Sequence, residues 1–234
     1  MLKKIYVGTS GWSYSWNLGG NLEWYVENSG LNAVELNASF YTYPYPSQLR
    51  FWMWVGRKLR WSVKVHRSIT HLYRLSEKSY SAWERFRKYY KPIEDLTDFY
   101  LIQLPPTYDR RESFFERIIR FARETSSRDK IAVEFRHLSW FRESPEKLCE
   151  ELDHIVIVSV DSPDITWFVS CRGIVYLRLH GRSEWYFHNY TEEELREIAA
   201  RIKDLSPDSV YVFFNNNHWM LENARRMLDL LTKK

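Results

Sequence analysis

Charged side chains stand at the ends of several short apolar runs in this sequence. Those that suit acid–base chemistry are Glu35, Lys64, Glu134 and His180. Two carboxylates can serve as general acid and general base, a lysine as a base or an electrostatic clamp, and histidine as the usual proton carrier near neutral pH. These residues predict acid–base catalysis, provided that the fold brings them together.

A second set of side chains is of the kind that holds a substrate in place. Arginine binds anions, amides and hydroxyls fix polar groups, and aromatic rings stack on sugar or base faces. This set predicts a small-molecule substrate that is sugar-like, nucleotide-like or otherwise anionic, which includes phosphorylated compounds. Its members are Ser10, Trp12, Asn37, Tyr41, Gln103, Arg136, Trp140, Asp161, Arg178 and Asn215.

A divalent metal ion is a weaker alternative at the same place. It would need three ligands such as Glu134, Asp161 and His180, which are residue types that suit such an ion. The sequence has no HxH or HExxH pattern, so the metal signal is weak. No cofactor is predicted.

A phosphate group has two candidate sites. Residues Gly8–Gly11 offer backbone N–H groups and two hydroxyls, although the pattern lacks the lysine of a Walker A loop. The second site would lie where phosphate sites of barrel enzymes usually lie, beside Arg178, Arg182 and the run Asn215–Asn217. At least one of these asparagines is expected only to shape a turn through left-handed backbone geometry.

Each of these assignments has a structural alternative. Glu35 and Glu134 could simply neutralise Lys64 or Arg178 in an ion network, because buried ionisable groups need partners. The loop aromatics, which also include Trp16, Tyr43, Trp185, Tyr186 and Trp219, could pack on one another over the core.

The elements that must position these residues follow from eight short apolar runs separated mostly by helix-like segments. Such an alternation predicts a (β/α)₈ barrel, with its chemistry at the C-terminal ends of the strands. The sixth crossover helix is expected to be short or irregular, because little sequence follows Asp161. The predicted strands are Lys4–Gly8, Leu31–Asn37, Arg60–Val65, Asp98–Leu104, Ile131–Phe135, Ile155–Val160, Ile174–His180 and Val210–Phe214.

Side chains alternate across a strand, which predicts the layers of the barrel mouth. Glu35, Lys64, Glu134, Arg178 and His180 are expected in the upper layer of the interior. The residues expected at the rim are Gln103, Asp161 and Asn215.

Three helix starts carry capping signals. Ser81–Glu84 and Thr191–Glu194 have the capping-box form, with a hydroxyl followed three residues later by a carboxylate. Ser144 precedes Pro145, which predicts an N-cap with proline at the first helical position.

The bulk composition predicts one cytoplasmic barrel domain over residues 1–234. The 234 residues fit a barrel of about 250 residues, and no N-terminal signal peptide or apolar run of about 20 residues is present. Cys149 and Cys171 have no zinc-site or CxxC spacing, so we expect reduced thiols. The sequence does not indicate the oligomeric state.

Seven blocks of the sequence together resemble the DUF72 family, also called the YecE or YunF-like family. The match spans nearly the whole chain, and it implies a TIM barrel but no established activity. One departure is the segment Leu18–Trp24, where members usually have a Phe-Tyr-Pro-like stretch, so the first loop is expected to differ. The blocks are Gly8–Tyr14, Glu35–Tyr41, Lys64 with Thr70-His71, Gln103–Pro106, Glu134–Trp140, Tyr176–Gly181 and Phe214–Asn216 with Asn223-Ala224.

Three classes of function therefore stay open. An acid–base enzyme acting at the barrel mouth is the leading hypothesis, with hydrolase, lyase and isomerase not distinguished. The net charge of +4 and the 11 tryptophans allow a nucleic-acid binding protein or a nuclease instead. A non-catalytic scaffold with a polar barrel mouth is the third hypothesis.

Overall fold

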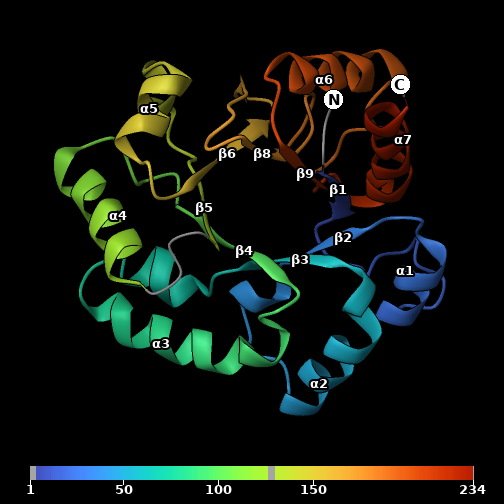
Figure 1. Ribbon diagram of the computed structural model, residues 1–234, viewed down its shortest axis with the longest axis horizontal. Coiled ribbons are helices and arrows are strands. Elements are labelled where there is room, and N and C mark those ends of the chain that lie inside the picture. Colours follow the sequence, from blue (N-terminus) through green and yellow to red (C-terminus); the bar gives the residue numbers. More distant parts are fainter. Residues whose placement is uncertain (1–3, 126–129, 234) are drawn as a thin grey trace.

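The computed structural model describes residues 4–125 and 130–233, which build a closed barrel of eight parallel strands with helices around it (Figure 1). β1 pairs with both β2 and β9, and the sheet closes where β5 pairs with β6. The predicted TIM barrel is confirmed. The eight strands are β1 (Lys4–Thr9), β2 (Ala33–Leu36), β3 (Arg60–Lys64), β4 (Thr97–Gln103), β5 (Ile131–Glu134), β6 (Val156–Asp161), β8 (Ile174–Leu179) and β9 (Ser209–Phe214).

Helices follow all strands of the barrel except β6. The two capping signals at Ser144 and Thr191 are confirmed, because each side chain accepts a hydrogen bond from the first helical turn. The third is wrong: helix α3 begins at Lys78, and Ser81 lies inside it with its hydroxyl directed back to the Lys78 carbonyl. The helices are α1 (Leu22–Asn28), α2 (Pro46–Val55), α3 (Lys78–Tyr90), α4 (Glu112–Glu124), α5 (Pro145–Glu151), α6 (Glu192–Asp204) and α7 (Met220–Thr232).

The connection between β6 and β8 contains no helix; all of residues 162–173 are described. A two-residue strand, β7 (Thr166–Trp167), runs antiparallel to the end of β6 instead. Thr166 pairs with Asp161 in this register, so β7 covers the point at which β6 ends.

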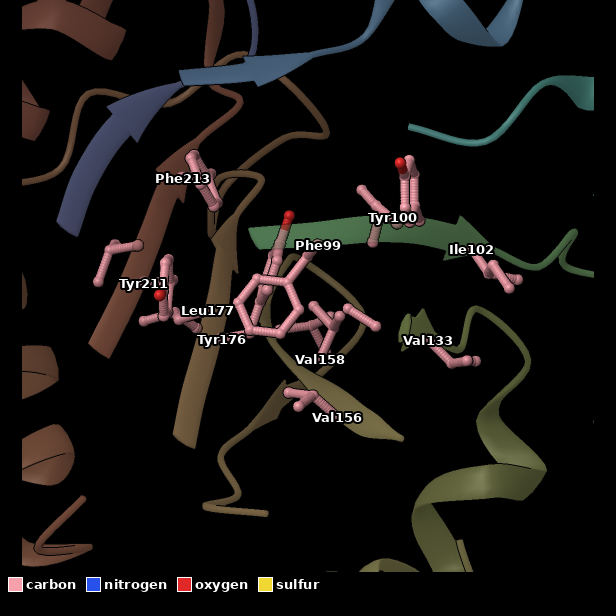
Figure 2. Packing of buried hydrophobic residues seen from close by; sticks show 14 of the residues in the cluster. Phe99, Tyr100, Ile102, Val133, Val156, Val158, Tyr176, Leu177, Tyr211 and Phe213 are labelled. Atoms are coloured by element: carbon pink, nitrogen blue, oxygen red, sulfur yellow. The ribbon is translucent and has the colours of Figure 1, made fainter. Parts of the chain in front are cut away.

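An aromatic layer fills the barrel below its mouth (Figure 2). Phe99 of β4 packs edge-on against Tyr176 of β8 at 5.4 Å and against Tyr211 of β9 at 4.8 Å between ring centroids. Phe213 lies 5.2 Å from Tyr176. Such close ring packing excludes water from the layer beneath the strand ends, so polar groups above it must find partners within the protein.

The expectation of two reduced thiols is wrong. Cys149 of α5 and Cys171, just before β8, form a disulfide with their Cα atoms 5.5 Å apart. The two residues are 22 positions apart in the sequence, and only the folded chain brings them together. The inference of a reducing compartment from the cysteines therefore loses its basis. None of the described helices is long and apolar enough to cross a membrane.

Candidate active site

Four ionisable side chains that sequence alternation placed in the upper layer are fully buried at the C-terminal ends of the strands. Glu35, Glu134, Arg178 and His180 each have 0% exposure. Charged groups are rarely removed from water unless they are paired, so their contacts decide what this layer can do.

Arg178 joins the two buried carboxylates. Its Nη2 donates to Oε1 of Glu35 at 2.7 Å, and its Nη1 donates to Oε2 of Glu134. Each carboxylate comes from a different part of the barrel, β2 and β5, and the arginine comes from β8. The guanidinium fork is suited to this bridging, since its donors are fixed in one plane.

Glu134 has two further cationic or polar neighbours. Nε of Arg136 lies 2.7 Å from Oε1 of Glu134. The two groups form an ion pair, but their geometry is not that of a hydrogen bond. His180 places its Nε2 3.0 Å from the same carboxylate oxygen, and its Nδ1 lies 3.3 Å from the amide nitrogen of Asn215. Because a carboxylate can only accept, Nε2 carries the proton and Nδ1 accepts from Asn215. In that tautomer the 3.2 Å contact from Nη2 of Arg136 to Nε2 joins two donors and is not a hydrogen bond.

The electrostatics of this group keep Glu134 ionised and His180 neutral. Burial alone would raise the pKa of Glu134, but the charges of Arg136 and Arg178 hold it well below its usual value. Burial, with a further contribution from Arg136, lowers the pKa of His180 to about 3. Glu134 is therefore ionised at neutral pH, where it accepts hydrogen bonds and anchors its neighbours but is poorly suited to take up or donate a proton.

Glu35 is held by three neutral side chains besides Arg178. Oε1 accepts from the Ser10 hydroxyl at 2.8 Å and from the Asn37 amide at 3.2 Å, and Oε2 accepts from the Tyr176 hydroxyl at 2.7 Å. Tyr176 was not predicted as a site residue. It lies two residues before Arg178 on the same face of β8, so strand alternation was the signal that could have found it.

Lys64 differs from the other charged groups of this layer. Within residues 4–125 and 130–233 its ammonium group has no hydrogen bond or ion pair, and the nitrogen lies 4.4 Å above the Phe40 ring. Burial, reinforced by Arg178, lowers the pKa of Lys64 to about 7. His71 contacts the Phe40 ring in a T-shaped arrangement at 4.9 Å and stays neutral, because burial and the nearby Lys64 lower its pKa to about 4.

Asp161 is separate from this cluster, although its sequence position places it at the same rim. Val160 stands beside Arg178 in the β6–β8 register, so Asp161 faces the opposite side of the sheet. There it accepts from Thr166 at 2.7 Å, Tyr190 at 2.9 Å and Arg182 at 3.1 Å.

The three ligands that were considered for a metal ion consequently do not form a metal site. Glu134 and His180 contact each other, but Asp161 belongs to the second cluster. Among the residues that the structure describes, no group of three or more His, Cys, Asp or Glu side chains is placed to hold a metal ion.

Three of the predicted substrate-binding residues have other surroundings. Trp140 is fully buried, stacks on Phe135 at 4.1 Å and donates its indole N–H to the Tyr108 carbonyl, so the expectation that it contacts substrate is wrong. Tyr41 is 65% exposed and contacts the edge of Phe40. Gln103 stands beside Glu134 in the β4–β5 register and is half-buried.

The two phosphate sites are not open either. In the first loop the N–H of Ser10 donates to the Phe214 carbonyl and the N–H of Gly11 donates to the Thr9 carbonyl. In the second loop Arg182 pairs with Asp161 and Glu197. An anion cradle needs free N–H donors or an unpaired arginine, so neither loop supports the prediction.

The asparagine run after β9 divides into different roles. Asn215 reaches His180, whereas the buried Asn216 amide donates to the His188 carbonyl at 2.8 Å. Asn217 has a φ of 61°, which confirms that one of the three residues shapes a left-handed turn. Only Asn215 therefore belongs to the site.

A groove of about 830 Å³ opens beside Glu35, between the loops that follow β1 and β2 and helix α2. Ser10 and Asn37, which both donate to Glu35, belong to its lining. We call it the aromatic groove, because its walls include Trp12, Tyr14, Tyr43, Tyr45, Phe51 and Trp52.

The fold and the cluster define this chain as a (β/α)₈ barrel with a buried, charged layer at the C-terminal ends of its strands. It belongs to the family described as "Protein of unknown function DUF72", whose model matches residues 6–234. No curated protein matches the chain.

Two solved structures show the similarity in three dimensions. A DUF72 family protein from Thermotoga maritima MSB8 is 28% identical, with a TM-score of 0.81 over 98% of this chain and 100% of that one. A DUF72 family protein from Enterococcus faecalis V583 is 22% identical, with a TM-score of 0.78 over 99% of each chain, and shows the fold alone.

Proposed function

We propose that this protein is an enzyme that moves a proton on a small anionic, sugar-like or nucleotide-like substrate, with Lys64 as the general base. The observation that carries the proposal is the contrast between Lys64 and its neighbours. Glu35, Glu134, Arg136 and Arg178 all form ion pairs, whereas the Lys64 amine has no hydrogen bond or ion pair in the described chain, and its pKa is about 7. A general base works best when its pKa lies near the working pH.

The charge balance of the layer supports an anionic substrate. Arg136 and Arg178 offset the charges of Glu35 and Glu134, and His180 is neutral. When Lys64 is protonated the layer therefore carries an excess of positive charge. A bound carboxylate or phosphate would offset that charge, and a proton taken up by Lys64 during the reaction would be stabilised by the same anion.

The other members of the cluster hold the base and the substrate in position. Arg178 holds both carboxylates in place, and His180 bonds Glu134 through Nε2 and Asn215 through Nδ1. Trp185 packs on this group, with its ring 4.6 Å from the Arg136 guanidinium and 5.4 Å from the His180 ring. Such rigid, water-poor surroundings strengthen every electrostatic interaction with the reacting atoms.

Proton transfer can be tested without knowing the product. The protein is incubated in D₂O with glucuronate, glucose 6-phosphate, ribose 5-phosphate and a nucleoside monophosphate, and deuterium incorporation at carbon is measured by mass spectrometry. We expect exchange or conversion of one of these compounds by the wild type and its loss in Lys64→Met. Lys58→Met is the matched control, because Lys58 is exposed and outside the layer. Equal exchange rates in the two variants would show that Lys64 is not the base.

A nucleic-acid binding protein or nuclease is the second candidate. Its support is the net charge of +4. Against it, no described residue that lines the aromatic groove is a lysine or an arginine. Binding to phosphates weakens steeply with salt, so an affinity for RNA or DNA that falls between 50 and 200 mM salt (roughly 10³-fold or more) would favour this reading.

A further inference from the structure

The aromatic groove combines three features that restrict what can bind there. It has a volume of about 830 Å³, within the range of about 300–1,000 Å³ for small-molecule sites. It adjoins the Glu35 carboxylate through Ser10 and Asn37. Its wall is formed by α2 and by the loops after β1 and β2.

The lining is polar but uncharged. None of the described lining residues is an aspartate, glutamate, histidine, lysine or arginine, and burial raises the pKa of the Tyr14 hydroxyl. A nucleotide phosphate or a carboxylate would find no cation in this groove. The polar lining consists of amides and hydroxyls, which can both donate to and accept from a ligand hydroxyl. These residues are Ser10, Ser13, Asn21, Asn37, Thr42 and Gln48.

Some of the aromatic walls are occupied by the protein itself, and others are free. The Tyr43 ring has His66 stacked at 5.0 Å and the Arg85 guanidinium at 5.5 Å, and Tyr14 stacks on Trp16. Tyr45 and Phe51, by contrast, are 76% and 40% exposed and stack on no other ring in the described chain. Exposed aromatic surface beside a hollow is typical of a binding site.

One buried polar atom in the lining also lacks a partner. The amide nitrogen of Asn37 donates to Glu35, and this fixes the orientation of the side chain. Its Oδ1 is then left buried without a hydrogen bond within the described part of the chain. A buried acceptor without a donor is destabilising, so this oxygen is suited to accept from a ligand hydroxyl.

From these observations we propose that the aromatic groove binds an uncharged sugar ring of the substrate. The ring stacks against Tyr45, Phe51 and the free surface of Trp52, and its hydroxyls bond to Asn37 and the other amides and hydroxyls. This assignment rests on the proposed function of the barrel mouth, because it places the anionic end of the same substrate at Lys64 and the arginines. The substrate class is therefore an anionic compound that carries an additional neutral sugar ring.

The binding test uses neutral trisaccharides, which can occupy the groove without engaging the charged layer. Titration calorimetry with cellotriose, maltotriose and tri-N-acetylchitotriose is expected to show binding of one of them at millimolar concentration or below. Tyr45→Ala and Trp52→Ala are expected to weaken it by about fivefold or more, since a lost aromatic contact is worth about 1 kcal/mol. The exposed position of Tyr45 makes its variant informative even if Trp52→Ala folds poorly.

Trp54→Ala is the matched control. Trp54 lies on the same helix and is 64% exposed, but it is not part of the groove lining. Its replacement should leave the affinity unchanged. Absence of binding for all three sugars, equal losses in Trp54→Ala and Tyr45→Ala, or tighter binding of adenosine than of any sugar would each overturn the proposal.

Two outcomes separate this inference from the proposed function. If Lys64→Met binds the trisaccharide as the wild type does while no compound exchanges deuterium, the groove assignment stands and the proton-transfer assignment falls. If exchange depends on Lys64 but Tyr45→Ala changes neither sugar affinity nor the exchange rate, the enzyme assignment stands and the sugar site falls.

Discussion

Two buried carboxylate clusters lie at the same end of the barrel, and they are built differently. In the first, Glu35 and Glu134 face the barrel axis, share Arg178, and have Lys64 beside them without a partner in the described chain. In the second, Asp161 faces the other side of the sheet and is bonded by Thr166, Tyr190 and Arg182.

The comparison shows how a functional cluster can be separated from a structural one. The second cluster joins β6, the short strand β7 and the loop after β8, where no helix covers the sheet. The side-chain contacts of Asp161 with Thr166, Tyr190 and Arg182 hold these segments together. The first cluster contains polar groups for which the described chain provides no hydrogen-bond partner, among them the Lys64 amine, Oδ1 of Asn37 and Nε of Arg178. Unsatisfied groups cost stability, and they persist where function needs them.

The largest expected effect comes from removing the shared arginine. Arg178→Met leaves two fully buried carboxylates without their common cation, and it should lower the free energy of unfolding by about 3–5 kcal/mol. Arg182→Met is the matched change in the second cluster. Its loss should be about 1–2 kcal/mol, because Asp161 keeps two hydroxyl donors and the Arg182 side chain is partly exposed.

Urea unfolding of both arginine variants at pH 7 measures this difference. A loss for Arg182→Met that equals the loss for Arg178→Met would mean that the two clusters contribute alike to the fold. In that case the distinction between a functional and a structural cluster would have no energetic support.

The second prediction concerns Lys64 and has the opposite sign. A lysine whose pKa is about 7 in the folded protein and 10.5 in the unfolded chain binds fewer protons when folded, between those two pH values. The contribution of Lys64 to the free energy of unfolding therefore rises with pH through that window and is lowest at and below pH 7. Lys64→Met should be more stable than the wild type by about 2–4 kcal/mol at pH 7, and the gain should shrink toward pH 10.5.

Thermal and urea unfolding across pH 6–10 test this sign, with Lys58→Met as the control for loss of a surface lysine. If Lys64→Met is less stable than the wild type at pH 7, Lys64 has a stabilising ion pair and is a structural member of the layer. Lys64 would then not lower the stability of the fold, and its burial would give no support to a catalytic role.

The third prediction uses two tyrosines that each donate to a buried carboxylate. Tyr176→Phe removes the donor to Glu35, and Tyr190→Phe removes the donor to Asp161. Each should cost about 1–3 kcal/mol, since a buried acceptor is left without its partner. Only Tyr176→Phe should also lower the rate of deuterium exchange, because Glu35 belongs to the layer beside Lys64 and Asp161 does not. An equal loss of exchange in both variants would place Asp161 within the catalytic unit.

The barrel itself was predictable because its signal is repeated. Eight apolar runs that end in polar residues indicate the strands and also the end at which those residues meet. The irregular connection after β6 was indicated only by its length. The short strand β7 was not predicted, because its two residues, Thr166 and Trp167, are too few to show a periodicity.

The composition of the site was predictable only in part, because the sequence does not fix which face of a buried strand points inward. Parallel strands are apolar on both faces, so the sequence did not show which residues of β6 point into the barrel. Asp161 was therefore grouped with Glu134 and His180, although it faces the opposite side of the sheet. For β8 the prediction that Arg178 and His180 point into the barrel was correct. The same alternation places Tyr176 on the inward face, although Tyr176 was not among the predicted site residues.

Trp140 shows a second limit of sequence analysis. It follows a strand end, as a substrate-binding aromatic would, and nothing in the local sequence distinguishes the two roles. The sequence did not show that Phe135 and the Tyr108 carbonyl are its partners. Phe135 was assigned to a strand, and Tyr108 is 32 residues away in the chain. Burial of a loop aromatic depends on such distant contacts, and these are known only once the chain is folded.

The smallest expected effect is an absence of titration at His180. Because burial and Arg136 lower its pKa to about 3, the imidazole should stay neutral from pH 8 down to pH 4, with the proton on Nε2. ¹⁵N NMR of labelled histidine gives both the tautomer and the pKa, and His180→Gln identifies the signal. The pKa of His180 is about 3 in the folded protein and 6.5 in the unfolded chain, so between these pH values the unfolded chain binds more protons. The contribution of His180 to the free energy of unfolding therefore rises with pH across this range. A signal that titrates near pH 6.5 would instead make His180 the neutral-pH proton carrier and would move the base from Lys64 to the histidine.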